Sequence, residues 1–365
     1  MNTKERNELV KEYITSKLDR AELLEENYFT TIKNYSELSS ILVNLIESKS
    51  MGFRGVVATA LAGLHLDGSF NPLTSFYSCN PRAIFEKGIF YAFENRVPCG
   101  KSDPLNVAKN TNVLDLEWAR GKRPQTASVA VVHYLEKVMS ASGHERGMLI
   151  DFFFFRLMAY SKRVKNFVIA NPISDVISHQ DIANKLADFV CRYPESGTTP
   201  QYVISVLLRE CFKHSAVSVL GGDESVFGTN TTSKKPADVW LELNNEPFML
   251  YEVTVKCVDL KRLDDSIQSL NSVGVLNLPI HFICRLPDDV SQLNNYHNGV
   301  LNYKGKAFNF VNLEDFILSI VSMLSVDSIK MVLNDLSIFM NKIDRKVSTK
   351  RGWNAVFAGE PFLGN

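Results

Sequence analysis

The feature that most constrains the fold of this chain lies within residues 238–256, where two segments of alternating apolar and polar residues flank a turn. Residues 238–243 and 248–256 are rich in strand-forming side chains, and residues 244–247 between them, Asn-Asn-Glu-Pro, are typical of a turn. The pattern predicts a β-hairpin. Reflection about a turn centred between Asn245 and Glu246 sets Asp238 opposite Val253, so Asp238 is expected beside Glu252 across the ladder.

The second strand of this hairpin is predicted to carry a polar row. Side chains alternate along a strand, so Glu252, Thr254 and Lys256 share one face while the two valines between them face the core. Neighbouring side chains on one face lie within roughly 5–8 Å of each other. Asp238 and Glu252 are therefore expected to be close enough to share one hard divalent cation through carboxylate oxygens.

This set of groups matches the needs of a metal-dependent phosphodiesterase. A divalent cation held by the two carboxylates polarises a phosphate and lowers the pKa of bound water. A lysine ammonium beside it stabilises the negative charge that develops, or positions the attacking water. The row therefore predicts phosphodiester hydrolysis.

The segments around the hairpin predict a regular succession of elements. An amphipathic helix comes first, then three strands, a second helix and a last strand, with expected ranges of 200–214, 216–220, 238–243, 248–256, 260–272 and 280–286. Pro-Ala-Asp238, a spacer of 13 residues, and Glu252 followed on its strand by a lysine resemble the PD-(D/E)xK motif. That motif marks type II restriction endonucleases and related repair and defence nucleases, whose core runs helix, three strands, helix, strand. Residues 98–124 also resemble, more faintly, restriction enzymes of the SacI type.

The resemblance implies a fold, an activity and a set of site residues. The fold is an α/β (α+β) protein with a restriction-endonuclease-like mixed sheet flanked by helices. The activity is Mg²⁺-dependent, sequence-specific cleavage of double-stranded DNA, with Asp238 and Glu252 as catalytic metal ligands and Lys256 as the catalytic lysine. In many family members the first helix supplies a further acid near the metals, and Glu210 fits that role by its placement.

The sequence departs from the family pattern at the lysine. The family places lysine two residues after the acid, where this chain has Thr254, and Lys256 follows two residues later, about 6.6 Å further along a strand. Lys234 or Lys235, just before the Asp238 strand, are alternative sources of the ammonium. A third alternative is a degenerate site that only binds DNA. The Gly221-Gly222 pair predicts a turn near the site, after which Asp223 or Glu224 is a candidate for an extra acid.

Regions outside the nuclease core predict contacts with DNA and with a second copy of the chain. Residues 1–195 are expected to be mainly helical, with residues 1–50 as a helical cap or dimerisation arm, residues 196–290 as the nuclease core and residues 291–365 as a helical region with a basic tail. Residues 80–123 interleave aromatic side chains with eight basic residues against five acidic ones. Those basic residues are Arg82, Lys87, Arg96, Lys101, Lys109, Arg120, Lys122 and Arg123. A second basic patch is predicted in the tail, formed by Lys342, Arg345, Lys346, Lys350 and Arg351.

Composition limits the cellular compartment and the class of protein that the sequence predicts. No run approaches the roughly 18 apolar residues needed to span a bilayer, and the charged N-terminal segment lacks the apolar stretch of a signal peptide. The six cysteines form no CxxC pair, which argues against zinc and favours a reducing cytoplasm. The formal net charge of 0 argues against a protein coated by nucleic acid over its whole surface, but it allows a basic cleft.

The sequence thus predicts a cytoplasmic type II restriction endonuclease that cuts both strands of a palindrome as a homodimer, with a cognate DNA methyltransferase as its genetic partner. Three alternatives remain open. One is a repair or anti-phage nuclease on the same core, and the second is a non-catalytic DNA-binding protein. The third is a helical regulator without a nucleic-acid role, in which the acidic face of the hairpin is merely solvated.

Overall fold

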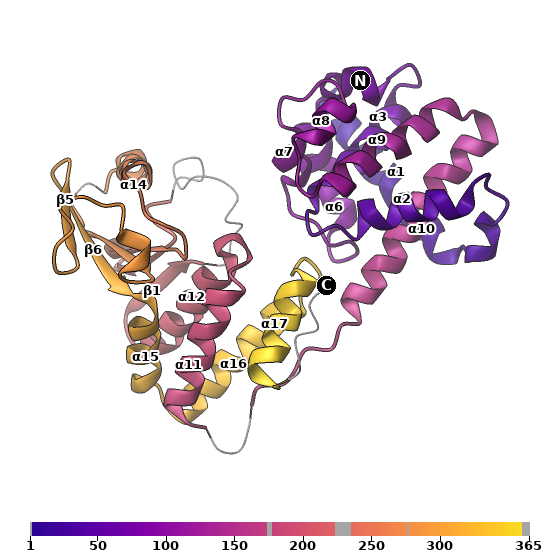
Figure 1. The fold of residues 1–365 in the computed structure, drawn as a ribbon. Coiled ribbons are helices and arrows are strands. Elements are labelled where there is room, and N and C mark those ends of the chain that lie inside the picture. The colour runs from indigo at the N-terminus through magenta and orange to yellow at the C-terminus, as the bar shows by residue number, and fades with distance from the viewer. Residues whose placement is uncertain (1, 174–176, 223–234, 276, 360–365) are drawn as a thin grey trace. The chain divides into compact units, whose positions relative to one another are not determined.

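The computed structural model describes residues 2–173, 177–222, 235–275 and 277–359, and its chain forms two compact units (Figure 1). Unit 1 comprises Met1–Phe167 with Lys342–Arg345, and unit 2 comprises Val168–Asn341 with Lys346–Asn365. The predicted boundary at residue 195 therefore falls inside unit 2. The reason is that the helix before that boundary and the C-terminal helices share one apolar core with the sheet.

The described residues of unit 1 are helical, as the sequence predicted for the N-terminal half. Its longer helices are α1 (Thr3–Leu23), α2 (Tyr35–Ile46), α3 (Gly52–Leu66), α9 (Gln125–Ser140) and α10 (Gly143–Lys165). Short helical segments connect them, namely η1 (Glu26–Phe29), α4 (Pro72–Ser75), η2 (Phe76–Cys79), α5 (Pro81–Ile84), η3 (Phe85–Ile89), α6 (Phe90–Phe93), α7 (Asp103–Ala108) and α8 (Leu116–Arg120).

The core of unit 1 forms around α1 and α10. Val10, Ile14 and Leu18 recur at helical spacing on α1 and are fully buried, so α1 is an integral core helix. Of the two expected roles, a helical cap or a dimerisation arm, this burial does not support the arm, because the apolar stripe of α1 is satisfied within its own unit. The aromatic run Phe152–Phe154 on α10 is also fully buried, as the sequence indicated.

Unit 2 is built on one mixed sheet with helices on both faces. Its strands are β1 (Val217–Gly221), β2 (Val239–Leu243), β3 (Glu246–Val253), β4 (Ile280–Cys284), β5 (Val300–Tyr303) and β6 (Lys306–Asn312). Its helices are α11 (His179–Arg192), η4 (Glu195–Gly197), α12 (Thr198–Phe212), α14 (Leu260–Val273), η5 (Asp288–Val290), α15 (Leu313–Met323), α16 (Val326–Asn341) and α17 (Val347–Phe357).

The order of the strands in the sheet is β1-β2-β3-β4-β6-β5. β1, β2 and β3 form an antiparallel meander, while β4 runs parallel to β3 and β6 runs parallel to β4. The connection from β3 to β4 contains α14, as expected for a crossover between parallel strands. The expected mixed sheet flanked by helices is therefore confirmed, with the predicted order of helix, three strands, helix and strand.

The two faces of the sheet belong to different apolar clusters. Val239, Tyr251 and Val253 face a core shared with α11, α12, α15 and α16. Leu250 and Phe282 face the opposite way, into a smaller cluster that includes Leu263 and Leu270 of α14. Figure 1 shows α14 separated from the group α11, α12 and α15 by the sheet. The alternation predicted for β3 is thus confirmed, but both faces are covered.

Two features of the C-terminal part of the chain differ from the prediction. Residues 306–312 form a strand within the region 291–365 that was expected to be helical, because β6 pairs with β4 and with β5 and so extends the sheet to six strands. In place of a free basic tail, Lys346–Phe357 contributes α17 to the core of unit 2. Lys350 is fully buried, and Trp353 Nε1 donates a 2.9 Å hydrogen bond to the carbonyl of Ala170.

No helix within the described ranges combines the length and the apolar character that crossing a bilayer requires.

Candidate active site

Two consecutive glycines at the end of β1 fix the position of Asp238. Gly221 and Gly222 have φ of +80° and +82°, which favours glycine. The N–H of Gly222 donates a 3.0 Å hydrogen bond to the carbonyl of Asp238, and a Cβ on Gly221 would lie 2.2 Å from that carbonyl. The turn predicted at Gly221-Gly222 therefore packs its backbone closely against Asp238 and holds the start of β2 in place.

The pairing of β2 with β3 brings Asp238 beside Glu252. Val239 pairs with Tyr251, one residue from the partner that the reflection predicts, and a β-bulge lies between Leu241 and Glu242 on the turn side of this pair. The N–H of Val253 donates a 3.0 Å hydrogen bond to Oδ2 of Asp238. The side chain of Asp238 thus crosses to the end of β3, where Glu252 precedes Val253.

The polar end of β3 is buried. Glu252 is 6% exposed and Thr254 is 3% exposed. Glutamate is rarely this buried unless its charge is paired or coordinated, because an isolated carboxylate loses its hydration. Burial of Glu252 against a pocket does not fit the reading in which this face of the hairpin is merely solvated.

Beyond Val253 the chain leaves the sheet, so the predicted polar row is interrupted. The Thr254 N–H still bonds to the carbonyl of Ile283 at 3.0 Å, but the Thr254 hydroxyl then accepts a 3.1 Å hydrogen bond from the backbone N–H of Lys256. Arg285 braces this turn, with Nη2 2.7 Å from the carbonyl of Val255. Lys256 is therefore exposed beyond the strand end and does not continue the row in register.

Helix α14 contributes a polar face to the same place. The side chain of Asp259 caps this helix by accepting a 2.9 Å hydrogen bond from the N–H of Arg262. One turn inside the helix, Nη1 of Arg262 donates a 2.6 Å hydrogen bond to the hydroxyl of Thr254. The sequence left Arg262 with equal support for a phosphate contact and for a solvated position. The structure turns Arg262 towards the end of β3.

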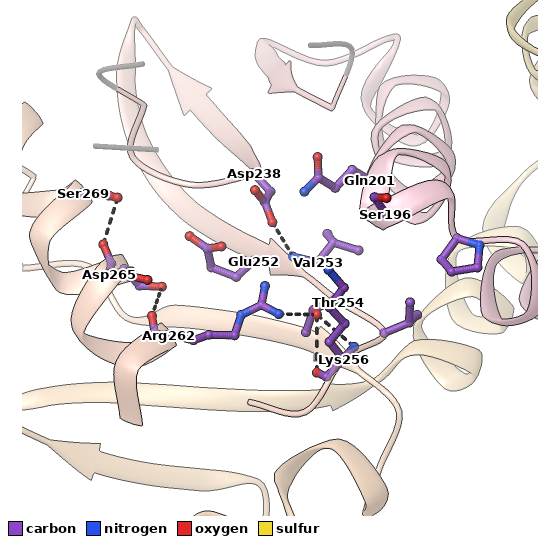
Figure 2. A pocket seen from close by; sticks show the side chains of 14 residues that line it. Ser196, Gln201, Asp238, Glu252, Val253, Thr254, Lys256, Arg262, Asp265 and Ser269 are labelled. Carbon is purple, nitrogen blue, oxygen red and sulfur yellow. Dashed lines mark hydrogen bonds between the residues drawn. The ribbon is translucent and has the colours of Figure 1, made fainter. Parts of the chain in front are cut away.

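These groups line a pocket of about 300 Å³. Figure 2 shows the labelled side chains around it, with Asp238 and Glu252 from the hairpin, Arg262 and Asp265 from α14, Ser196 from η4 and Gln201 from the start of α12. The full lining is Pro194, Ser196, Gly197, Gln201, Asp238, Glu252, Val253, Thr254, Val255, Lys256, Arg262, Asp265, Ser266 and Ser269. The structure therefore brings together Asp238, Glu252 and Lys256 from the predicted set.

Glu210 is not part of this pocket. Its carboxylate lies 3.2 Å from Nζ of Lys213, near the C-terminal end of α12. The pocket meets α12 at its first turn, and nine residues of helix separate Gln201 from Glu210, or about 13 Å at 1.5 Å per residue. The side chain that α12 presents to the pocket is thus the neutral amide of Gln201.

Of the alternative lysines and acids that the sequence suggested, only Lys235 lies within the described residues. Lys235 does not line the pocket. Lys234, Asp223 and Glu224 lie outside the described residues.

The residues present fit one Mg²⁺ ion. Mg²⁺ prefers oxygen ligands, keeps several waters and is commonly bound by one or two carboxylates together with substrate phosphates. Asp238 and Glu252 supply two carboxylates from adjacent strands. No group of three or more His, Cys, Asp or Glu side chains suited to a metal is present in the part of the chain that the structure describes. The donor set therefore fits an open magnesium site that leaves room for substrate oxygens.

The basic region of residues 80–123 lies in unit 1 and is only partly available for nucleic acid. Arg96 is engaged, with Nη1 2.7 Å from Asp19 and Nη2 3.2 Å from Glu22, and Arg82 lies 3.5 Å from Glu86. The other six basic residues make no ion pair with the described residues. Most of the interleaved aromatic side chains pack into or against the core, among them Phe85, Phe93 and Trp118, whereas Tyr91 is exposed.

Sequence reasoning missed Gln201 altogether and left Arg262 undecided between a phosphate contact and a solvated position. The signal for Arg262 was present, because an aspartate N-cap at Asp259 fixes which residues form the first turn of α14. Gln201 carried no such signal. Its role depends on the turn Glu195–Gly197, where three successive residues have positive φ, including Ser196 at +64°.

Comparison of the chain with protein-family models found no matching family, and comparison with curated proteins found no match.

Proposed function

We propose that this protein is a Mg²⁺-dependent nuclease that hydrolyses phosphodiester bonds of double-stranded DNA at the pocket around Asp238 and Glu252. The observation that carries the proposal is the meeting of these two carboxylates with the guanidinium of Arg262 in one pocket. Paired acids from adjacent strands with a cation beside them suit a reaction in which negative charge develops on phosphate oxygens.

Each residue of the pocket has a proposed role in this reaction. Asp238, whose carboxylate is oriented by the N–H of Val253, and the buried Glu252 would hold the Mg²⁺ ion. When bound, that ion polarises the phosphate and lowers the pKa of a coordinated water. Arg262 and Lys256 place positive charge at the rim of the same pocket. The amide of Gln201 and the hydroxyl of Ser196, on its opposite side, are suited to orient a water or a sugar-phosphate oxygen.

The reaction consumes one water for each bond cut. The oxygen of the water forms a bond to phosphorus while the bond from phosphorus to one sugar oxygen breaks; the water loses a proton to solvent, and the leaving sugar oxygen takes up a proton from solvent. The products are a phosphate monoester end and a hydroxyl end. Cleavage at defined sites, as in a type II restriction endonuclease, would further require base contacts, for which the six basic residues of residues 80–123 that make no ion pair with the described part of the chain are candidates.

Within this proposal the protein acts in the cytoplasm as a homodimer, beside a DNA methyltransferase that protects the same sites. A repair or anti-phage nuclease on the same core is the second candidate. The observation that favours it is that unit 1 buries much of the aromatic surface expected to contact bases. A non-catalytic DNA-binding protein is the third candidate, because Thr254 replaces the family lysine.

The test is incubation of the purified chain with unmethylated phage DNA, in Mg²⁺ and in EDTA. Discrete fragments that appear only with Mg²⁺ would support site-specific cleavage, and a Mg²⁺-dependent smear would favour a nuclease without sequence preference. Intact DNA that is bound in a salt-dependent way would leave the non-catalytic alternative.

A further inference from the structure

We propose that Arg262, reaching in from the first turn of α14, supplies the catalytic positive charge that the family motif takes from a lysine on the strand. The inference rests on the proposed nuclease function and assigns the cation within it. It replaces Lys256, the sequence-based candidate, with a residue from a different element.

The position of the guanidinium supports this assignment. Thr254 follows Glu252 by two residues on the same face, which is the place where the motif has its lysine. The hydroxyl of Thr254 accepts a 2.6 Å hydrogen bond from Nη1 of Arg262. Figure 2 shows the Arg262 guanidinium between the labelled Glu252 and Thr254 side chains.

The guanidinium is held there from both ends. Asp259 caps α14 through the N–H of Arg262, which fixes the start of the side chain. The Thr254 hydroxyl, itself fixed by the backbone N–H of Lys256 at 3.1 Å, fixes the other end. Lys256, in contrast, is exposed beyond the end of β3, and its position along the chain does not bring it into register with Glu252. A preorganised donor stabilises a transition state better than a mobile one, because it does not have to be ordered during the reaction.

The chemistry of arginine defines what this cation does. A guanidinium stays protonated in proteins, so Arg262 cannot accept the proton of the attacking water. It can donate two parallel hydrogen bonds to non-bridging phosphate oxygens, a geometry that an ammonium cannot reproduce. Within the described part of the chain, Thr254 is the acceptor to which the guanidinium donates. Its remaining N–H groups are therefore suited to the phosphate, and Arg262 acts by stabilising charge.

The experiment measures single-turnover cleavage of DNA with Mg²⁺ by the full chain carrying single substitutions. Arg262→Ala should lower the rate constant roughly 100- to 1,000-fold, the usual effect of removing one transition-state donor. Arg262→Lys should retain part of the rate, and methylguanidine added to Arg262→Ala should restore part of it. A residue that merely supported the fold would not respond to methylguanidine. The matched control is Lys261→Ala, on the adjacent exposed residue of α14 that does not line the pocket.

A compensating double variant keeps the test independent of folding. Thr254→Lys combined with Arg262→Ala returns the cation to the strand, and it should cleave faster than Arg262→Ala alone. The inference is overturned if Arg262→Ala cleaves like the wild type while Lys256→Ala is inactive, an outcome that leaves the nuclease function intact. Absence of any cleavage by the wild-type chain would overturn the nuclease function and this inference together.

Discussion

The hydroxyl of Thr254 joins two elements of unit 2, accepting a 2.6 Å hydrogen bond from Nη1 of Arg262 on α14 and a 3.1 Å hydrogen bond from the N–H of Lys256 after β3. A threonine that is 3% exposed is thus satisfied by a charged donor and by the backbone at once. The Thr254 hydroxyl therefore holds the Arg262 guanidinium at the end of β3, two residues after Glu252. Thr254 thus acts as a positioning residue.

Thr254→Val keeps the shape of the side chain and removes the acceptor. The variant should lose about 1–3 kcal/mol of stability, because the N–H of Lys256 and the guanidinium of Arg262 lose their partner. Its cleavage rate should fall while its affinity for DNA stays close to that of the wild type. Thermal unfolding, single-turnover kinetics and DNA titration measure the three effects. Thr254→Ser, which keeps the hydroxyl, is the control, and equal rates for the serine and valine variants would contradict the role of this hydrogen bond.

Gly221 should be intolerant of a side chain although it does not line the pocket. A Cβ there would lie 2.2 Å from the carbonyl of Asp238, so Gly221→Ala must displace the start of β2. We expect a loss of at least about 1–3 kcal/mol from the positive φ alone, with the clash in addition, and a weaker apparent affinity for Mg²⁺ in the cleavage assay.

Gly274→Ala is the matched control for that variant. Gly274 has a similar φ of +75°, but no atom lies within 4 Å of the position of a Cβ. It should show the backbone cost and an unchanged requirement for Mg²⁺. Equal behaviour of the two variants in the Mg²⁺ titration would argue against the contact between Gly221 and Asp238.

His65 should make unit 1 sensitive to acid. His65 is exposed, but its ring stacks on Tyr13 with centroids 4.0 Å apart, and this partial desolvation, followed by the nearby charge of Lys17, lowers its pKa below the ordinary value of 6.5. A depressed histidine pKa means that the unfolded chain binds a proton more readily than the folded one. Neutral His65 therefore contributes its full stabilisation of the folded state above pH 6.5. This stabilisation is lost as the pH falls through 6.5 towards the lower pKa that His65 has in the folded protein.

Replacing His65 with Gln should remove this part of the acid destabilisation. Unfolding midpoints between neutral and acid pH measure the effect, with the exposed His144→Gln as the control. A slope of stability against pH that is the same in His65→Gln as in the wild type would show that His65 does not contribute.

The sequence predicted those parts of the fold that depend on local patterns. The hairpin of β2 and β3 followed from alternation around the Asn244–Asn245 turn, where both residues have positive φ. The helices α12 and α14 followed from apolar periodicity. The expectation that Asp238 lies beside Glu252 tolerated a register error of one residue, because the observed pairing of Val239 with Tyr251 still sets their neighbours Asp238 and Glu252 next to each other.

The parts that were missed depend on contacts between distant segments. Glu210 has the residue type of an accessory acid, but the pocket meets α12 at its first turn, and no local pattern contains that information. The burial of Lys350 follows from the docking of α17, whose residue Asn354 bonds to the N–H of Ala170 at 2.8 Å and to the carbonyl of Val168 at 3.0 Å. Residues 306–312 alternate as a strand only because β4 and β5 are available to pair with them.

The central claim is that Asp238 and Glu252 form the magnesium site of a DNA nuclease, and the most direct measurement is cleavage of unmethylated phage DNA by the wild type, Asp238→Asn and Glu252→Gln at increasing Mg²⁺. The account predicts fragments from the wild type, and rates lowered by more than roughly 1,000-fold in both variants, since each loses a ligand carboxylate in a site that has two. Both variants should remain folded and should still bind DNA. Cleavage by either variant at the rate of the wild type, or no cleavage by the wild type in Mg²⁺ or Mn²⁺, would contradict the claim that Asp238 and Glu252 form the magnesium site of a DNA nuclease.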